Sequence, residues 1–450
     1  MDFLFNLLRG TLGIFILLAI AFAVSNNKRR INWRLVATAI GMQIFFAVFI
    51  IHSEYLRSIF FVLGWPKDII NAIGAGIVAL LGFTQTGAEF VFGKLVYNTG
   101  IESLGFFFAF QVLPTIIFVS ALTSILYYLG ILQLIVKGMA WVMAKLLGTS
   151  GAESLSCTAN IFVGQTEAPL LIRPFIEKMT NSELLTVMVG GMATIAGGVM
   201  ASYIQMLGQS FADANNIPLQ QAQLKFAVQL LAASVMAAPA SLALSKILFP
   251  EIEEPVTKGT VKLKVDKNAS NVIEAAATGA GEGLQLALNV AGMLIAFIAL
   301  IALFNAIFTG VGDMIGINAY LIKTYGQPLS LQLIFGMALQ YLAYGIGVPW
   351  ADSFHFGSLI GTKVVLNEFV AYADLTTLIK SQVMSEKGIM MATYALCGFA
   401  NFSSIAIQIG GIGPLAPNRK KDIAALGLKA VLGGTLATLM TATLAGILVQ

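Results

Sequence analysis

Residues 283–312, GLQLALNVAGMLIAFIALIALFNAIFTGVG, form a stretch of 30 residues without a single charge, between Glu282 and Asp313. About 20 apolar residues suffice for a helix to cross the hydrocarbon core of a bilayer. Further charge-free stretches of similar length cover residues 103–136, 184–212, 226–245, 324–351, 388–418 and 430–450. The whole chain is 58% hydrophobic and 11% charged, whereas soluble domains carry roughly 25% charged residues. The sequence therefore predicts an all-α polytopic membrane protein.

The remaining composition excludes several other functions. The net charge of +4 is small and dispersed, which argues against nucleic acid as a partner. Two cysteines and two histidines give no basis for a disulfide framework or a zinc site. The sequence contains no Walker loop, HExxH or GxSxG motif, so we expect neither an ATP-driven pump nor an enzyme. No small-residue cleavage site follows the first apolar segment, which we interpret as a retained span rather than a signal peptide.

Basic clusters predict the orientation of the chain in the membrane. They lie at residues 25–30, 250–271 and 418–422, and basic loops stay in the cytoplasm. This assignment is consistent with eight full crossings and with both termini outside. The predicted crossings include helices over 3–24, 33–51, 104–134, 184–208, 221–248, 273–308 and 423 onward. The stretch 54–96 contains Pro66 and scattered charges, and we expect part of it to form an amphipathic interfacial helix on the outer surface, with a short membrane span as the alternative.

Two stretches do not fit simple spans, and each is expected to be a re-entrant hairpin of two half-helices. They cover residues 150–182 and 328–375, and each is followed by an apolar helix with a polar break, at 192–198 and at 399–404. Non-helical backbone at membrane depth requires burial in protein or a water-filled cavity. Paired interrupted segments in two halves of a chain indicate the midplane site of a secondary transporter built from inverted repeats.

Polar side chains concentrate in these interrupted segments. A carboxylate at membrane depth costs at least about 2.5 kcal/mol, so Glu167 and Glu368 are candidate functional residues. Arg173 lies beyond Pro169 and is expected at the cytoplasmic mouth of the first hairpin, which leaves the site without an arginine for an anionic substrate. The neighbouring polar residues suit a neutral, hydroxyl-rich ligand: Asn160, Gln165, Asn401, Ser403 and Ser404.

Three motifs resemble those of the concentrative nucleoside transporters. The first is GQTEAPLLIRP at residues 164–174, and it is the most specific of the three. NEFVAY follows at 367–372, after Gly361 and Lys363, and CGFANF at 397–402. The motifs occur in the family's order and extend the resemblance over most of the chain from about residue 100.

The resemblance implies a substrate site and a sodium site. The nucleobase would face Gln165, Thr166, Glu167 and Val199, with Gly164 at the hairpin tip influencing base preference. The ribose would be held by Glu368, Asn401 and Ser404, with Phe399 lining the same pocket. Sodium would be bound by the side chains of Asn160 and Thr194 and by the carbonyls of Val163 and Ile195; some relatives have serine in place of this threonine. No cofactor other than the coupling Na⁺ is implied.

The family architecture also implies how the chain is divided. A scaffold and a moving transport domain would make up each protomer of a homotrimer in the cytoplasmic membrane. We expect scaffold helices with the interfacial helix at 1–149, the first hairpin and broken helix at 150–249, and a cytoplasmic loop at 250–272. A scaffold helix at 273–327 and the second hairpin, broken helix and final helix at 328–450 complete the division.

Simpler explanations and other functions remain open at this point. Glu368 could form a structural ion pair with Lys363, Asn401 could join two helices, and Asn160 could cap a half-helix. The leading hypothesis is a sodium-coupled nucleoside importer that accepts purines and pyrimidines. The alternatives are proton coupling through Glu167 or Glu368, a membrane-embedded enzyme acting on a nucleoside or lipid, and a channel.

Overall fold

The computed structural model describes residues 2–59, 64–97, 105–259 and 269–449, and the regular elements of this part of the chain are helices. Within it only an isolated bridge pairs extended backbone, between Ser150 and Lys258. Eight helical segments of the described residues are long and apolar enough to cross a membrane, which confirms the all-α polytopic class. They are α1 (Asp2–Ala23), α2 (Trp33–Ile51), α4 (Trp65–Phe92, continued by η3, Gly93–Val96), α5–α6 (Phe108–Gln111 and Leu113–Tyr128), α10–α11 (Asn181–Ala193 and Gly197–Asn215), α12 (Leu219–Leu248), α13 (Val272–Met314) and α20 (Lys420–Leu448).

The eight segments differ from the predicted crossings in that they include α4 and leave out the broken helix near residue 400. Helix α4 is continuous over 28 residues, because Pro66 lies in its first turn, where proline is tolerated. Its placement in the interface rather than across the bilayer stays a prediction. The broken helix near residue 400 is not among the eight, since its halves α18 (Glu386–Leu396) and α19 (Phe402–Ile412) have 11 residues each.

The first hairpin closely follows the prediction. Helix α8 (Gly151–Ala159) begins with a capping box between Ser150 and Glu153, and Asn160 is its C-cap. The chain then turns and returns through η4 (Ala168–Ile172) and the short helix α9 (Arg173–Ile176). The prolines of the returning limb lie in the first turns of these two segments, where the missing backbone donor has little cost.

The second hairpin is shorter than predicted and begins later. It consists of α16 (Trp350–Val365) and α17 (Glu368–Lys380), whereas the residues before it form a separate helix, α15 (Leu331–Gly345). The expected boundaries of 328–375 were therefore wrong. The interruption at Gly345–Pro349 separates two helices rather than two limbs of the hairpin, and Gly357 lies within α16, where it permits close approach to the backbone of α15.

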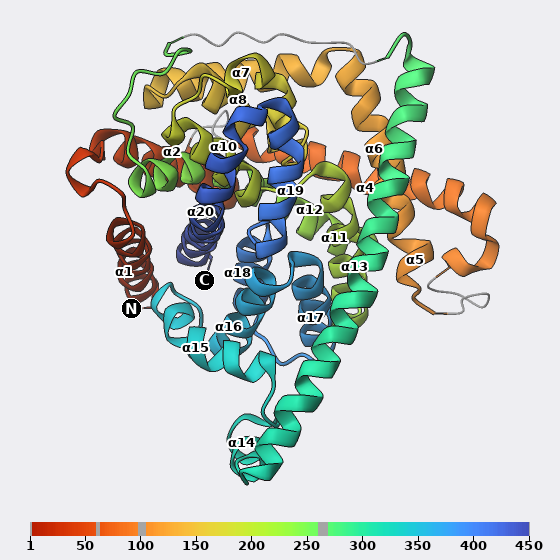
Figure 1. Cartoon of the computed structure of the whole chain (residues 1–450). Helices are drawn as coiled ribbons and strands as arrows, with labels where there is room; N and C mark the ends of the chain where they lie inside the picture. Colours follow the sequence, from red (N-terminus) through yellow and green to blue (C-terminus); the bar gives the residue numbers. More distant parts are fainter. Residues whose placement is uncertain (1, 60–63, 98–104, 260–268, 450) are drawn as a thin grey trace.

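The helices form two sets in the same order, as expected for an internal repeat. The first set is α6, α7 (Ile131–Leu147), the first hairpin, α10–α11 and α12; the second is α13, α15, the second hairpin, α18–α19 and α20. Corresponding members pack together: α6 on α13, and α12 on α20. Figure 1 shows α13 as a long helix that runs diagonally from top to bottom, with α14 (Asn318–Tyr325) at its lower end. Glycines allow the contact, since a Cβ at Gly283 would lie 2.8 Å from the Cα of Ile117.

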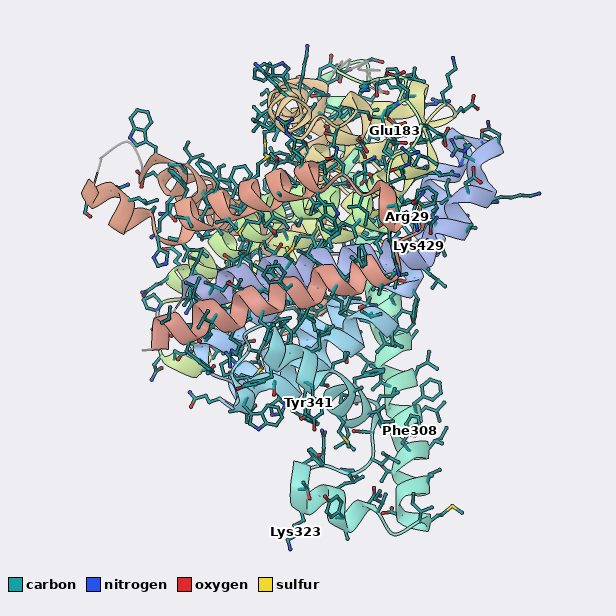
Figure 2. The ribbon with its side chains drawn as sticks, turned by 90° about the vertical axis from the view of Figure 1, so that its left-hand side faces the viewer. Arg29, Glu183, Phe308, Lys323, Tyr341 and Lys429 are labelled. Carbon is teal, nitrogen blue, oxygen red and sulfur yellow. The ribbon has the colours of Figure 1, made fainter. Side chains whose placement is uncertain are left out.

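The basic clusters gather at one end of the helices. The backbone N–H of Asn26 donates to the carbonyl of Leu248 (3.0 Å), and Arg419 donates to the side chain of Asn181 (2.7 Å). Figure 2 shows Arg29, Glu183 and Lys429 on the same side of the molecule. The lysines of the loop at positions 262, 264 and 267 lie outside the described residues.

The two termini lie at the opposite end. Gly10 of α1 packs against Ile447 of α20, so the start of one helix adjoins the end of the other. The markers of the two ends are close together in Figure 1. This arrangement matches the prediction that both termini lie on the same side, opposite the basic loops. The remaining short segments are α3 (Ser53–Ile59), η1 (Lys28–Arg30), η5 (Gly413–Leu415) and η6 (Pro417–Arg419).

Candidate functional site

The two helix breaks meet inside the protein. Helix α10 ends at Ala193 and α11 begins at Gly197, while α18 ends at Leu396 and α19 begins at Phe402. A Cβ at Gly398 would lie 2.7 Å from the carbonyl oxygen of Met192, so the backbones of the two breaks are in direct contact. Each break exposes carbonyls and N–H groups that an intact helix would use internally. The half-helix N-termini also bring positive dipole ends to this depth.

Asparagines start the half-helices of the second repeat. Asn401 precedes α19, and its Oδ1 accepts from the backbone N–H of Ser404 (2.9 Å). Asn367 precedes α17, and its Oδ1 accepts from the N–H of Val370 (2.9 Å). Both side chains are buried. Each of these asparagines caps a half-helix with its oxygen alone, which leaves the NH₂ group for other partners.

Glu368 is held by two uncharged donors rather than by a cation. Its carboxylate accepts from the amide of Asn401 (2.9 Å) and from the hydroxyl of Tyr203 (3.2 Å), and the residue is 4% exposed. Lys363 is also fully buried, but its ammonium donates to the carbonyl of Ala395 (2.8 Å) and to the hydroxyl of Thr438 (3.1 Å). Among the ion pairs of the described residues, none joins Lys363 to Glu368. The structural ion pair considered from the sequence is thus not formed.

Gln165 connects the first hairpin to this group. Its amide donates to the hydroxyl of Ser404 (3.2 Å), which places the hairpin tip against α19. Thr166 packs beside Gly411 of the same helix, where a Cβ would lie 2.6 Å from the threonine methyl. The structure therefore brings Gln165, Ser404, Asn401 and Glu368 into one connected chain. Val199 is buried in the first turn of α11, and Phe399 is half-buried in the second break.

Glu167 and Gly164 face a different space. They line a cavity of about 280 Å³ between the first hairpin and the helices α6, α7 and α13. Glu282 of α13 lines the same cavity, together with hydroxyl and amide side chains from Ser120, Thr123, Ser124, Gln133 and Thr278. No hydrogen bond in the described residues links the side chain of Glu167 to Gln165 or Glu368. Glu167 is thus the one predicted substrate carboxylate that lies apart from the connected chain.

The residues expected to bind sodium lie at the first break and the turn beside it. The Asn160 amide donates to the carbonyl of Ser156 (3.0 Å), which leaves Oδ1 buried and without a hydrogen-bond partner among the described residues. The Thr194 hydroxyl donates its proton to the carbonyl of Gly190 (2.9 Å), so its lone pairs remain free. The N–H of Gly197 donates to the carbonyl of Phe162 (3.2 Å) and thereby ties the break to the hairpin turn.

This group of oxygens fits a hard monovalent cation. The carbonyls of Val163 and Ile195 accept no hydrogen bond within the described part of the chain. A buried carbonyl or amide oxygen without a donor is uncommon, because leaving it unpaired costs free energy. An unwound helix that presents such oxygens is the arrangement in which secondary transporters coordinate Na⁺.

Three residues of the site were not identified from the sequence. They are Tyr203, which binds Glu368; Gln408, which binds Gln165; and Glu282, which lines the cavity beside Glu167. Two of them had a detectable signal, since Tyr203 is four residues after Val199 and Gln408 four after Ser404, on the same helix faces. Glu282 had none, because nothing in the sequence places the start of α13 opposite the first hairpin.

Comparison with known families covers most of the chain. Residues 12–95 match the model of the Na⁺ dependent nucleoside transporter N-terminus, residues 109–210 match nucleoside recognition, and residues 229–446 match the Na⁺ dependent nucleoside transporter C-terminus. The nucleoside permease NupC of Helicobacter pylori is 39% identical, with 99% of each chain covered. Sodium/nucleoside cotransporter 1 of Mus musculus is 40% identical over 97% of this chain, which spans 63% of the mouse protein.

A solved structure agrees with these matches. The inward-facing, substrate-bound state of CNTnw superimposes with a TM-score of 0.84 at 41% identity, and 98% of each chain is covered. Helical repeats, two hairpins and two helix breaks define a secondary transporter. The chain belongs to the concentrative nucleoside transporter family, and it is a multi-pass nucleoside transporter of the cytoplasmic membrane rather than an enzyme.

Proposed function

We propose that the protein is a sodium-coupled symporter that imports nucleosides by alternating access. The observation that carries the choice of ion is the unpaired Oδ1 of Asn160, buried at the start of the hairpin turn that the Gly197 N–H joins to the first helix break. A proton carrier has no use for an amide oxygen at this position, whereas Na⁺ requires such oxygens. The names of the matched families and of the mouse relative refer to sodium as well.

The proposed substrate site divides into a base side and a sugar side. Gln165, Thr166, Glu167 and Val199 would contact the nucleobase, with Gly164 shaping the tip. The hydrogen-bonded group of Glu368, Asn401 and Ser404 would bind the ribose hydroxyls, and Phe399 would line the pocket. Ribose hydroxyls can donate to a carboxylate and accept from an amide or a hydroxyl, so this group can satisfy both capacities of the sugar.

Sodium would bind to the side chains of Asn160 and Thr194 and to the carbonyls of Val163 and Ile195. We further propose that the protein is a homotrimer in which each protomer has its own pathway. The scaffold would comprise the helices before the first hairpin together with α13, and the transport domain the hairpins, broken helices, α12 and α20. CNTnw structures in inward-facing and outward-facing states support the alternating-access part of the proposal.

Uptake into proteoliposomes tests the choice of coupling ion. Radiolabelled uridine is supplied under an inward Na⁺ gradient, under the same gradient of choline, and under a pH gradient without Na⁺. We expect concentrative uptake of chemically unchanged uridine with Na⁺ alone. Concentrative uptake that is driven by the pH gradient in the absence of Na⁺ would establish proton coupling instead.

A further inference from the structure

Gln408 is a fully buried glutamine behind the proposed base site. It lies on α19, one turn after Ser404, and has no exposed surface. Its NH₂ group donates to the carbonyl oxygen of Met188 in α10 (2.9 Å) and to Oε1 of Gln165 at the hairpin tip (3.0 Å). One side chain of the second repeat therefore holds both a helix and a hairpin of the first repeat.

The orientation of these amides follows from the chemistry of their partners. A backbone carbonyl can only accept, so the NH₂ group of Gln408 must face Met188. The same NH₂ group then requires an acceptor at Gln165, which directs Oε1 of Gln165 toward Gln408. The NH₂ group of Gln165 consequently points the other way, where it donates to the hydroxyl of Ser404 (3.2 Å). The direction of every hydrogen bond in this series is thus fixed. Gln408 donates to Met188 and to Gln165, and Gln165 donates to Ser404.

Close packing prevents the two amides from adopting other orientations. A Cβ at Gly191 would lie 2.8 Å from the Cβ of Gln165 and 3.2 Å from the Nε2 of Gln408, so α10 fits against both glutamines without free space. If the Gln165 amide rotated by half a turn, its NH₂ group would face the NH₂ group of Gln408. Two buried donors would then oppose each other, which is unfavourable.

The geometry points to Gln408 as a positioning residue that fixes which end of the Gln165 amide is available to the nucleobase. This inference rests on the proposed assignment of Gln165 to the base side of the site. With its carbonyl occupied by Gln408, Gln165 retains one N–H and one lone pair in fixed directions. Ser404, which accepts from Gln165, retains its own proton for a substrate acceptor. The donor and acceptor pattern is therefore set before the nucleoside arrives, which lowers the cost of ordering on binding.

A double-mutant cycle tests this role. Uridine binding to the purified, full-length protein in Na⁺ is measured by calorimetry for Gln408→Met, Gln165→Met and the double variant. Methionine is close in shape but donates nothing, and it also removes Gln408 Oε1, a buried oxygen without a partner in the described residues. We expect uridine to bind about fivefold more weakly to Gln408→Met, the effect of one neutral hydrogen bond.

The second half of the cycle distinguishes positioning from direct contact. In the Gln165→Met background, Gln408→Met should change the affinity by less than about twofold, because the amide that it orients is gone. Gln43→Met is the matched control: Gln43 is equally buried, donates to Thr441 (2.9 Å) between α2 and α20, and also has an unpaired oxygen. Its uridine affinity should stay within about twofold of the wild type. If Gln408→Met does not fold, Gln408→Leu takes its place.

The outcomes separate this inference from the proposed function. Penalties that add in the double variant, or an unchanged affinity in Gln408→Met, would overturn the role of Gln408 while leaving sodium-driven uptake intact. An unchanged affinity in Gln165→Met would remove Gln165 from the base site, and the role of Gln408 with it. Absence of uridine binding to the wild type in Na⁺ would instead contradict the proposed function itself.

Discussion

At the scale of single residues, Glu368 gives the sharpest prediction about the sugar. Its carboxylate is held by Asn401 and Tyr203 (2.9 and 3.2 Å), and charge strengthens such hydrogen bonds. Glu368→Gln retains the shape without the charge, and we expect uridine binding to weaken by about 1.5–3 kcal/mol. The penalty should shrink for 2′,3′-dideoxyuridine, which lacks the donors concerned. Equal losses for both ligands would remove Glu368 from the sugar site, and the exposed Glu386→Gln is the control.

The sodium site is tested at Asn160. Asn160→Ala removes the unpaired Oδ1, so the Na⁺ concentration for half-maximal uptake should rise about tenfold or more, consistent with the loss of a buried ligand worth at least 1.4 kcal/mol. Uridine affinity at saturating Na⁺ should change much less. Asn215→Ala, at the exposed far end of α11, serves as control. An unchanged Na⁺ dependence in Asn160→Ala would contradict the assignment.

Base preference is tested at the hairpin tip. We predict that the wild type carries both uridine and adenosine, because Gly164 adds no side chain that would crowd a two-ring base. A Cβ at this position would run into the carboxylate of Glu167, so Gly164→Ser should narrow the pocket. The shift toward pyrimidines should be modest, about 1–3 kcal/mol. Competition against labelled uridine measures it, and failure of adenosine and guanosine to compete in the wild type would refute the broad specificity.

At the scale of elements, the contact between the two helix breaks should tolerate no added volume. A Cβ at Gly398 would lie 2.7 Å from a backbone oxygen of α10, whereas a Cβ at Gly410 in α19 would meet nothing within 4 Å. Overpacking of this kind costs about 1–3 kcal/mol. We therefore expect Gly398→Ala to lower the thermal midpoint in detergent and to impair uptake, while Gly410→Ala is neutral. Equal behaviour of the two variants would show that the breaks can separate at little cost.

At the scale of the whole molecule, the proposed cycle moves one positive charge with each neutral nucleoside. A potential of 100 mV contributes about 2.3 kcal/mol per charge, and a tenfold Na⁺ gradient adds about 1.4 kcal/mol. The sum of about 3.7 kcal/mol supports accumulation of roughly 500-fold. Abolishing the potential with a K⁺ ionophore should lower the uridine plateau to about tenfold. A plateau that does not respond to the potential would mean that the cycle is electroneutral.

Much of this protein was predictable from the order of its residues. Charge-free stretches such as 283–312 predict membrane helices, because a charged side chain inside a bilayer would have no water to solvate it. The basic clusters gave a topology consistent with the packing of α1 against α20, and GQTEAPLLIRP with its two companion motifs identified the family. Element boundaries do not follow from such patterns, because glycine and proline mark an interruption without specifying which elements it separates. The interruption at Gly345–Pro349 lies between α15 and α16 and not inside a hairpin.

The pairings within the site were decided only by the tertiary structure. Gln165 and Gln408 are separated by 243 positions, and no local pattern fixes that their amides meet. Lys363 is five residues before Glu368 and was a plausible partner, yet it bonds to Ala395 and Thr438. The physical reason is that sequence determines which segments are apolar, broken or capped through local interactions, whereas hydrogen-bond partners depend on which breaks and turns the packing of the two repeats brings together.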